Sequence, residues 1–527
     1  MNKQKRKNQN KYRKTKFMGI LAGCVMFVWV GCEDFLTPSP ESFTSTGDYF
    51  DQPSHFEAGV NSAYARLRAQ AGVQDGNFRM ITEQRFDAIN RQFDINLPGV
   101  NQQPFQEWFA VPSNSVPRGQ WNEIFNTIAQ TNIVLDRLDD IEWADATQRN
   151  QIEAQAKFIR AFSYYFGVQM FGDFPIVTEE QTTPEIAIDK VRSPVSEVLN
   201  NLIIPDLVFA AQNLPAVWSD PGRATSGAAL TLLGKTYLLS GDYDLAIDAL
   251  EDVVGQYSLL DSYTSIFDPG NTNNEESIFE LQFGPNITGQ PQAISPAILV
   301  PLHARGEIVD NIINPSNNGM YPSFEVLEFY EDGDERFEEG LVPFDDPENS
   351  GFPEVAHGPE NTIYLLNKYL WPNYINAQGE MEGNIILLRY ADVLLSLAEA
   401  HWRNGDGAAL ALPYVNEVRA RSGLGPVVLP TVFNSFMLEG TDLENDDLGR
   451  AIFNERTVEF LAEGHRMFDL LRFGVAYDVA AAQAESRKTR EPRISGVYNI
   501  DPHEILLPIH PQEIAASNGQ ITQNPGW

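Results

Sequence analysis

Apolar residues recur at steps of three and four along most of this chain, and that spacing restricts the fold to one built mainly from helices. Such runs cover residues 121–138 and 150–170. The second run stops at residues 171–175, Phe-Gly-Asp-Phe-Pro, where Gly and Pro together end a helix. A further helix is expected at 195–214, interrupted near Pro205. The pattern therefore predicts a mostly α fold.

Two segments resemble the helical hairpins of tetratricopeptide repeats, in which small residues on one helix let a second helix approach. The first covers residues 226–260, with a turn at 240–243, and the second covers 387–424, with a turn at 404–407. The residues at the small and large positions are Leu233, Gly234, Tyr237, Ala246, Leu250, Ala398 and Tyr414. Two weak matches do not make a regular solenoid, so we expect irregular helical pairs with long insertions.

Three long insertions, at residues 71–118, 262–325 and 341–384, are rich in Gly, Pro, Asn and aromatic residues and show few periodic runs. Loops of this length inside a compact domain usually carry function. We therefore expect the ligand-binding surface in these insertions.

The N-terminus has the form of an export signal. Eight Lys and Arg precede an uncharged apolar run at 17–31, which is followed by Cys32. Fifteen helical residues rise about 22 Å, less than the roughly 30 Å of a hydrocarbon core, so a signal peptide is favoured over a membrane span. A small residue before Cys resembles a bacterial lipobox, in which the Cys is acylated and anchors the protein. We expect a signal peptide at 1–31, a lipidated tether at 32–45 and a single domain at 46–527.

Cys24 is an alternative lipidation site, because residues 21–24, Leu-Ala-Gly-Cys, also fit a lipobox. Lipidation there would leave residues 25–30 as an exposed apolar stub, whereas Cys32 leaves a polar, Pro-containing tether. We therefore favour Cys32. A signal anchor that is not cleaved is the third alternative.

Charge and cysteine content restrict how the domain is stabilised and which partners it can bind. Both Cys residues of the chain are in the leader, so the domain has no disulfide and depends on its core. Removal of the eight leader cations leaves 29 of the 37 Lys and Arg residues. The 72 Asp and Glu residues then give a net charge near −43. Such a charge repels nucleic acids and anionic lipid surfaces, so we expect no nucleic-acid partner.

No catalytic or metal-binding motif is evident, so we expect neither an enzyme nor a bound cofactor. His503-Glu504 begins like a zinc motif but lacks a second His one helical turn later. The acidic run 331–335 lacks the spacing of an EF-hand loop, so a solvated surface is favoured over a structural calcium site. A glycosidase with two dispersed carboxylates is the remote alternative.

The densest pattern of charges covers residues 454–474, which we expect to form one helix. Three glutamates lie four residues apart, with Arg and Asp on neighbouring rows beside an apolar stripe. This arrangement favours buried or half-buried ion pairs that fix helix packing, and it disfavours a catalytic role for the glutamates. The residues expected to be structural are Arg389, Glu455, Arg456, Glu459, Glu463, Arg466, Asp469 and Arg472.

Residues 455–472 read Glu-Arg-x-x-Glu-Phe-x-x-Glu-Gly-x-Arg-x-x-Asp-Leu-x-Arg, which resembles the C-terminal signature of the SusD/RagB-like lipoproteins of Bacteroidetes. His465 and His510 depart from the family pattern without touching a known role. Further segments similar to family motifs lie at 32–36, 157–175, 386–400 and 507–527. The resemblance implies four tetratricopeptide-like helical pairs that carry a loop-rich ligand-binding half.

The resemblance also implies a surface-exposed lipoprotein of the outer membrane that covers a SusC-type TonB-dependent transporter. Such proteins capture glycans or oligopeptides for import and do not catalyse a reaction. We expect a glycan ligand. An oligopeptide is the alternative, and it would favour a large groove without an aromatic platform.

A glycan site needs aromatic rings that stack on the apolar faces of sugars and polar side chains that bond the hydroxyls. Trp108 is the strongest candidate for an exposed stacking ring, because amide side chains surround it between two Pro-bearing loop segments. The candidates in the three insertions are Arg91, Asn101, Phe105, Trp108, Arg305, Tyr321, Trp371 and Tyr374. The alternative is that each ring anchors its loop to the helical core.

Replacing Cys32 with Ala is expected to release the protein from the membrane without unfolding it, because the predicted core begins after the tether. Membrane fractionation and globomycin-sensitive processing of the variant measure this. Release by Cys24→Ala but not by Cys32→Ala would assign lipidation to Cys24 instead.

Overall fold

The computed structural model describes most of the chain beyond residue 48. The described residues are 49–71, 77–91, 108, 111–181, 191–283, 320–345, 362–369, 383–431, 435–490 and 500–527. The chain divides into two compact units, 1–51 and 52–527, and the second is described below. The expected signal peptide, both candidate lipidation sites and the tether lie outside the described residues. In the part described, no helix combines the length and the apolar character needed to cross a membrane.

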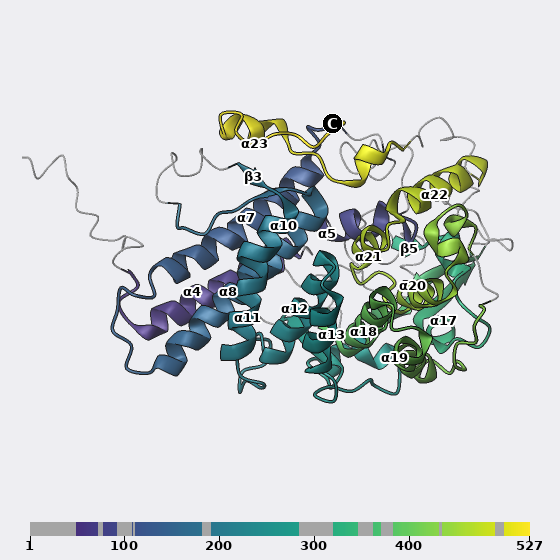
Figure 1. The fold of residues 1–527 in the computed structure, drawn as a ribbon, viewed down its shortest axis with the longest axis horizontal. Coiled ribbons are helices and arrows are strands. Elements are labelled where there is room, and N and C mark those ends of the chain that lie inside the picture. Colours follow the sequence, from purple (N-terminus) through teal and green to yellow (C-terminus); the bar gives the residue numbers. More distant parts are fainter. Residues whose placement is uncertain are drawn as a thin grey trace, which may run out of the picture. The chain divides into compact units, whose positions relative to one another are not determined.

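Three long helices form the N-terminal part of the second unit, and each contacts the other two (Figure 1). They are α4 (Pro53–Gln70), α7 (Ser115–Asp136) and α8 (Ala146–Phe171). The side chain of Asp145 caps α8 by accepting the N–H of Thr147. The helix ends at Gly172, whose φ of 73° is open to Gly without strain. The break predicted at 171–175 is therefore present.

The helix expected at 195–214 is interrupted, as its Pro predicts. It consists of α10 (Val195–Val198), the π-helical turn η2 (Leu199–Ile203) and α11 (Ile204–Asn213). Pro205 lies in the first turn of α11, directly after the π-helical turn. α11 packs between α8 and the first hairpin.

Both predicted hairpins are present, and the prediction of a mostly helical fold is confirmed. The first consists of α12 (Ser226–Ser240) and α13 (Tyr243–Glu251), and the second of α18 (Tyr390–Asn404) and α19 (Ala408–Arg421). Helix α13 packs against α18, so the two hairpins lie side by side. Small residues let the helices approach, because a Cβ on Gly234 would lie 2.4 Å from Cγ of Leu250.

Short strands and helices connect these helical pairs. Within the described residues the strands form four two-stranded antiparallel sheets: β1 (Ile89–Arg91) with β5 (Met320–Pro322), β2 (Phe174–Pro175) with β3 (Arg192–Ser193), β4 (Ser277–Leu281) with β8 (Ile385–Arg389), and β6 (Leu341–Asp345) with β7 (Thr362–Leu366). The remaining helices are α5 (Asn77–Arg79), η1 (Met80–Gln84), η3 (Thr264–Phe267), η4 (Pro269–Asn271), α16 (Phe324–Leu327), α17 (Glu335–Gly340), η5 (Asn367–Tyr369), η7 (Phe436–Leu438), η8 (Asp442–Asn445), α20 (Asp447–Glu459), α21 (Arg466–Phe473), α22 (Ala476–Arg490), η9 (Pro502–Ile505) and α23 (Pro511–Ala516).

The single helix expected at 454–474 is wrong. Helix α20 ends at Glu459 and α21 begins at Arg466. Between them Ala462 and Gly464 adopt φ values of 63° and 94°, which no α-helix contains. The turn has a packing reason, because a Cβ on Gly464 would lie 2.7 Å from the ring of Phe78.

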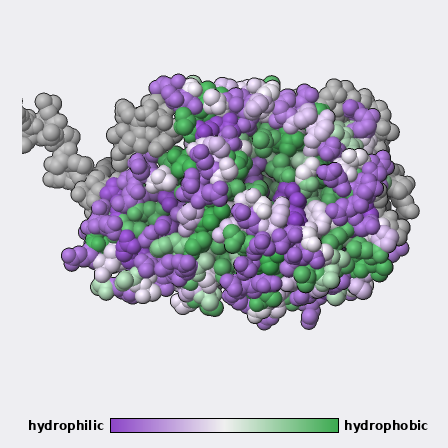
Figure 2. Space-filling model, viewed as in Figure 1, coloured by the Kyte–Doolittle hydropathy of each residue, from purple (hydrophilic) through white to green (hydrophobic). Residues whose placement is uncertain are grey.

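The visible surface mixes polar and apolar residues. Hydrophilic residues cover much of the face in Figure 2, and apolar residues form separate patches between them. Among the described residues, the most exposed large apolar side chains are Val217 and Val428, at 82% and 76%. Scattered exposed apolar residues are usual on a folded protein and need no partner.

Gly234→Val is expected to lower the melting temperature, because the new side chain meets the fully buried Leu250. Overpacking of this kind costs about 1–3 kcal/mol. Thermal unfolding measures the effect. Gly425→Val is the matched control, since a Cβ there meets nothing within 4 Å. Equal melting temperatures for the two variants would mean that the hairpin is not packed as described.

Candidate functional site

Two of the predicted ligand-binding loops begin or end at one strand pair. Strand β1 pairs with β5, so that Asn90 lies opposite Tyr321 and Arg91 lies opposite Met320. The chain leaves β1 at Arg91 towards residues 92–107, and it enters β5 at Met320 after residues 284–319. The bases of these two loops are therefore neighbours.

The third loop starts beside the same segment. The short helix η5 ends at Tyr369, from which the chain continues into residues 370–382. The guanidinium of Arg79 donates to the Tyr369 hydroxyl at 3.4 Å and lies 4.8 Å from its ring centroid. Strand β7, which leads into η5, lies beside β5. We call residues 77–91 the hub segment, because the bases of all three loops meet it.

Trp108, where the first loop returns, is buried rather than exposed. Its side chain is 3% exposed, so the prediction of an exposed stacking ring is wrong. The Arg85 guanidinium lies 4.1 Å from the indole centroid, and the Phe86 ring meets it edge-on at 5.4 Å. Burial lowers the pKa of Arg85 to about 9. A cation–π contact and an aromatic contact thus anchor Trp108 to the hub segment.

The other predicted ligand-binding residues divide into two groups. Tyr321 is 5% exposed, so the structure buries this ring as well. Arg91 is the last residue of strand β1. The remaining candidates, Asn101, Phe105, Arg305, Trp371 and Tyr374, lie outside the described residues. The structure thus brings the loop bases together, and it buries two of the aromatic rings that were expected to contact ligand, Trp108 and Tyr321.

Buried charges hold the hub segment to α21 and the turn before it. Arg466 Nε donates to Asp87 Oδ1 at 2.7 Å, and its Nη2 donates to Asp87 Oδ2. The N–H groups of Gly464 and Arg466 donate to Glu83 Oε1 at 2.6 and 3.4 Å. Burial raises the pKa of Glu83 to about 7, against hydrogen bonds that favour its charged form. The turn that breaks the expected helix is therefore the turn that binds the hub.

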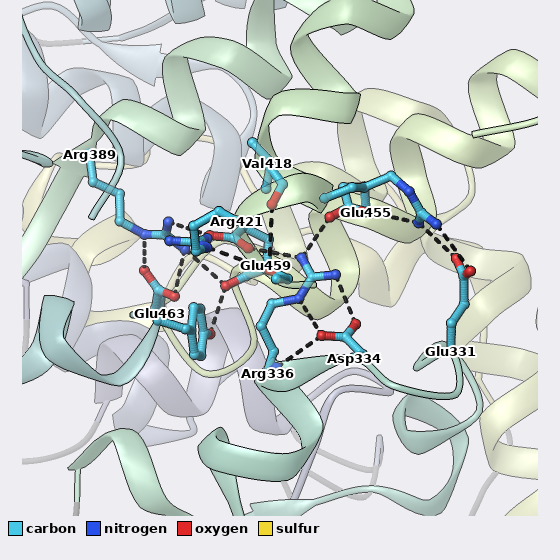
Figure 3. Close-up of polar contacts among 12 residues, drawn as sticks. Glu331, Asp334, Arg336, Arg389, Val418, Arg421, Glu455, Glu459 and Glu463 are labelled. Carbon is cyan, nitrogen blue, oxygen red and sulfur yellow. Dashed lines mark hydrogen bonds and ion pairs between the residues drawn. The ribbon is translucent and has the colours of Figure 1, made fainter. Parts of the chain in front are cut away.

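A larger ion network continues from this turn (Figure 3). Glu459 accepts from Arg389 at 2.6 Å, from Arg336 at 2.9 Å and from Arg421. Glu463 accepts two hydrogen bonds from Arg389, at 2.8 and 3.0 Å. Burial alone would raise the pKa of Glu459, but the three arginines hold it below its usual range. The network joins β8, α17, α19 and α20.

A second set of ion pairs joins α18 of the second hairpin to α20 and α21. Arg456 donates to both oxygens of Asp469 at 3.0 and 2.9 Å, and to Asp392 at 3.0 Å. Arg472 donates to Glu399 at 2.8 and 2.7 Å. The eight predicted structural residues are thus all buried or nearly so and ion-paired, and their role in helix packing stays a prediction.

The acidic run 331–335 is used in the same way. Asp334 accepts two hydrogen bonds from Arg336, at 2.9 and 2.8 Å. Glu331 accepts two from Arg419, at 2.7 and 3.0 Å. In the described ranges, no group of three or more His, Cys, Asp or Glu is placed to hold a metal ion. The run therefore gives the calcium hypothesis no support.

The sequence left several key partners unidentified. Glu83 and Asp87 are spaced for one face of a helical turn, but Asp87 and its partner Arg466 are 379 residues apart. Lys368, which donates to Glu463 at 2.9 Å, sits between loop segments without periodicity. Arg336 follows Asp334 by two residues, a spacing at which Asp334 would be expected to cap a helix. That pattern does not indicate that Arg336 is a buried cation. No local signal in the sequence marks Asp87, Lys368 or Arg336 as a member of a buried ion pair.

Comparison with known proteins identifies relatives along most of the chain. The family model of the SusD family matches residues 346–527, and one described as "Starch-binding associating with outer membrane" matches residues 34–238. SusD-like protein P25 of Formosa agariphila is 24% identical, over 93% of this chain and 95% of the relative. Starch-binding protein SusD of Bacteroides thetaiotaomicron is 23% identical, over 89% and 91%. A solved laminarin binding SusD-like protein is 26% identical, with a TM-score of 0.73 over 91% of this chain and 100% of that chain.

Arg466→Ala is expected to destabilise the protein by about 3–5 kcal/mol, because it leaves Asp87 buried without its cation. Thermal or denaturant unfolding measures the loss. Lys488→Ala is the matched control, since its pair with Glu485, 3.2 Å apart, is exposed and surface pairs contribute about 0–1 kcal/mol. Unchanged stability in Arg466→Ala would show that the hub segment is held by other contacts.

Proposed function

This chain belongs to the SusD-like family, and we propose that it is a surface lipoprotein that binds glycans and passes them to a SusC-type TonB-dependent transporter. The observation that carries the proposal is the meeting of three loop bases at residues 77–91. Loops that start from one rigid base can present their side chains to one ligand. The fold then acts as a scaffold, and the loops set the specificity.

The composition of the three loops supports a sugar ligand. They contribute Trp and Tyr rings for the apolar faces of pyranoses, and Asn and Arg side chains for the hydroxyls. We propose Asn101, Phe105, Arg305, Trp371 and Tyr374 as ligand-binding residues. The relatives described as starch-binding and laminarin-binding agree with this chemistry.

A neutral glycan fits better than the alternatives. The net charge near −43 after the leader repels glycans rich in sulfate or uronic acid. None of the relatives named above is described as binding a peptide. The buried carboxylates around Glu459 are occupied by arginines, which suits a binding protein and not a glycosidase.

The proposed location is the outer face of the outer membrane. The leader and Cys32 supply the export signal and the lipid anchor, and one matching family model is described as associating with the outer membrane. A TonB-dependent transporter would be the partner that receives the glycan. Co-purification of the protein with a transporter from detergent-solubilised outer membranes tests this part of the proposal.

Trp371→Ala is expected to weaken glycan binding while leaving the melting temperature unchanged. One stacking ring contributes on the order of 1–2 kcal/mol, which is roughly five- to thirty-fold in affinity. Isothermal titration of the purified protein with laminarihexaose and maltoheptaose measures this.

The control for this experiment is Trp108→Ala. That substitution removes a buried ring and should lower stability by about 3–5 kcal/mol. A wild-type protein that binds neither these sugars nor other neutral oligosaccharides would contradict the proposed function. If Trp371→Ala does not affect binding, then Trp371 is not a ligand-binding residue and the site consists of other loop residues.

A further inference from the structure

A surface groove lies away from the hub segment, between the first hairpin and the end of α19. It consists of two pockets of about 490 and 590 Å³, and Tyr257 and Ser258 line both. The first pocket is bounded by the loop between α11 and α12 and by β4. The second is bounded by Tyr390 and by the C-terminal end of α19. We call these two pockets together the Tyr257 groove.

Two partly exposed aromatic rings with fixed positions line this groove. The Trp218 Nε1–H donates to the carbonyl of Ala224 at 2.7 Å, which fixes the indole. The Tyr257 hydroxyl lies 3.2 Å from the Thr225 hydroxyl. Gly227 lets the phenol approach α12, because a Cβ there would lie 2.6 Å from the Tyr257 hydroxyl. Rings held in place before binding lose little freedom when a ligand stacks on them.

The polar groups of the groove are acceptors and amides. Glu275, which is exposed, accepts from the Ser258 hydroxyl at 3.1 Å. Asn273, also exposed, exchanges amide hydrogen bonds of 3.0 and 2.9 Å with Gln282. The second pocket adds three exposed carboxylates, those of Asp261, Glu335 and Glu417.

The two cations that line the groove are already paired. Arg223 donates to Asp220 at 3.3 Å and to Gln155 at 3.0 Å. Arg421 donates to Glu276 at 3.3 Å and to Glu459. The groove therefore has a net negative charge. It repels sulfated and uronic-acid glycans, whereas its carboxylates can accept hydrogen bonds from sugar hydroxyls.

We propose that the Tyr257 groove is a second binding site, for a neutral oligosaccharide whose sugar rings stack on Trp218 and Tyr257. This inference rests on the proposed function and adds a second site to it. Two adjacent pockets with an aromatic residue between them suit a chain of several sugars. A second site would let the protein hold one long glycan at two points, which raises its apparent affinity.

The test uses a substitution that fills the groove without removing a packed side chain. Ser258 is exposed and lines both pockets, so Ser258→Trp blocks the groove. Ser196, exposed on α10 and outside the groove, provides the matched control Ser196→Trp. Each is made in the wild-type chain and in Trp371→Ala, where the loop site is weakened and the groove contributes a larger share of the measured binding. Isothermal titration uses laminarihexaose and maltoheptaose.

The expected result is residual sugar binding in Trp371→Ala that Ser258→Trp weakens on the order of tenfold or more and that Ser196→Trp leaves unchanged. Equal affinity and stoichiometry with and without Ser258→Trp would overturn the second site and leave the proposed function intact. Binding of a peptide or a sulfated glycan in the groove would also overturn it. Absence of any sugar binding by the wild-type protein would overturn both proposals.

Discussion

The bidentate pair between Arg466 and Asp87 fixes the hub segment against α21, and the positions of the three loop bases depend on it. Arg466 is 5% exposed and Asp87 is fully buried, so neither charge can be satisfied by water. A buried ion pair adds little net stability compared with apolar packing, but loss of one partner is expensive. The pair is therefore better understood as specifying where the hub lies than as a source of stability.

The rest of the charge network also specifies how its helices and strands pack. Glu459 receives hydrogen bonds from three arginines that come from β8, α17 and α19. An alternative packing of any of these elements would leave a buried charge without a partner. The network thus favours one arrangement of the helical pairs, and the loops extend from that arrangement.

The part of the fold that could be predicted from sequence is the part decided by near neighbours. Apolar spacing and Gly turns depend on residues a few positions apart, so both hairpins and the break after α8 could be located. The single helix at 454–474 was wrong because Gly464 donates to Glu83, which lies 381 residues away in the chain. The burial of Trp108 was not predicted for a related reason, since only its tertiary contacts with Arg85 and Phe86 distinguish an anchoring ring from an exposed one. The charge pattern identified the signature residues, several of which pair with one another, such as Arg456 with Asp469. It did not identify their more distant partners Asp87, Arg336 and Lys368.

Hydrogen exchange of the purified protein, with and without saturating laminarihexaose or the neutral oligosaccharide that binds most tightly, tests the central claim directly. If the loops built on residues 77–91 form one binding surface, residues 92–107, 284–319 and 370–382 should all gain protection at the same sugar concentration. Protection confined to one of the three, or sugar binding with none of them protected, would contradict the account.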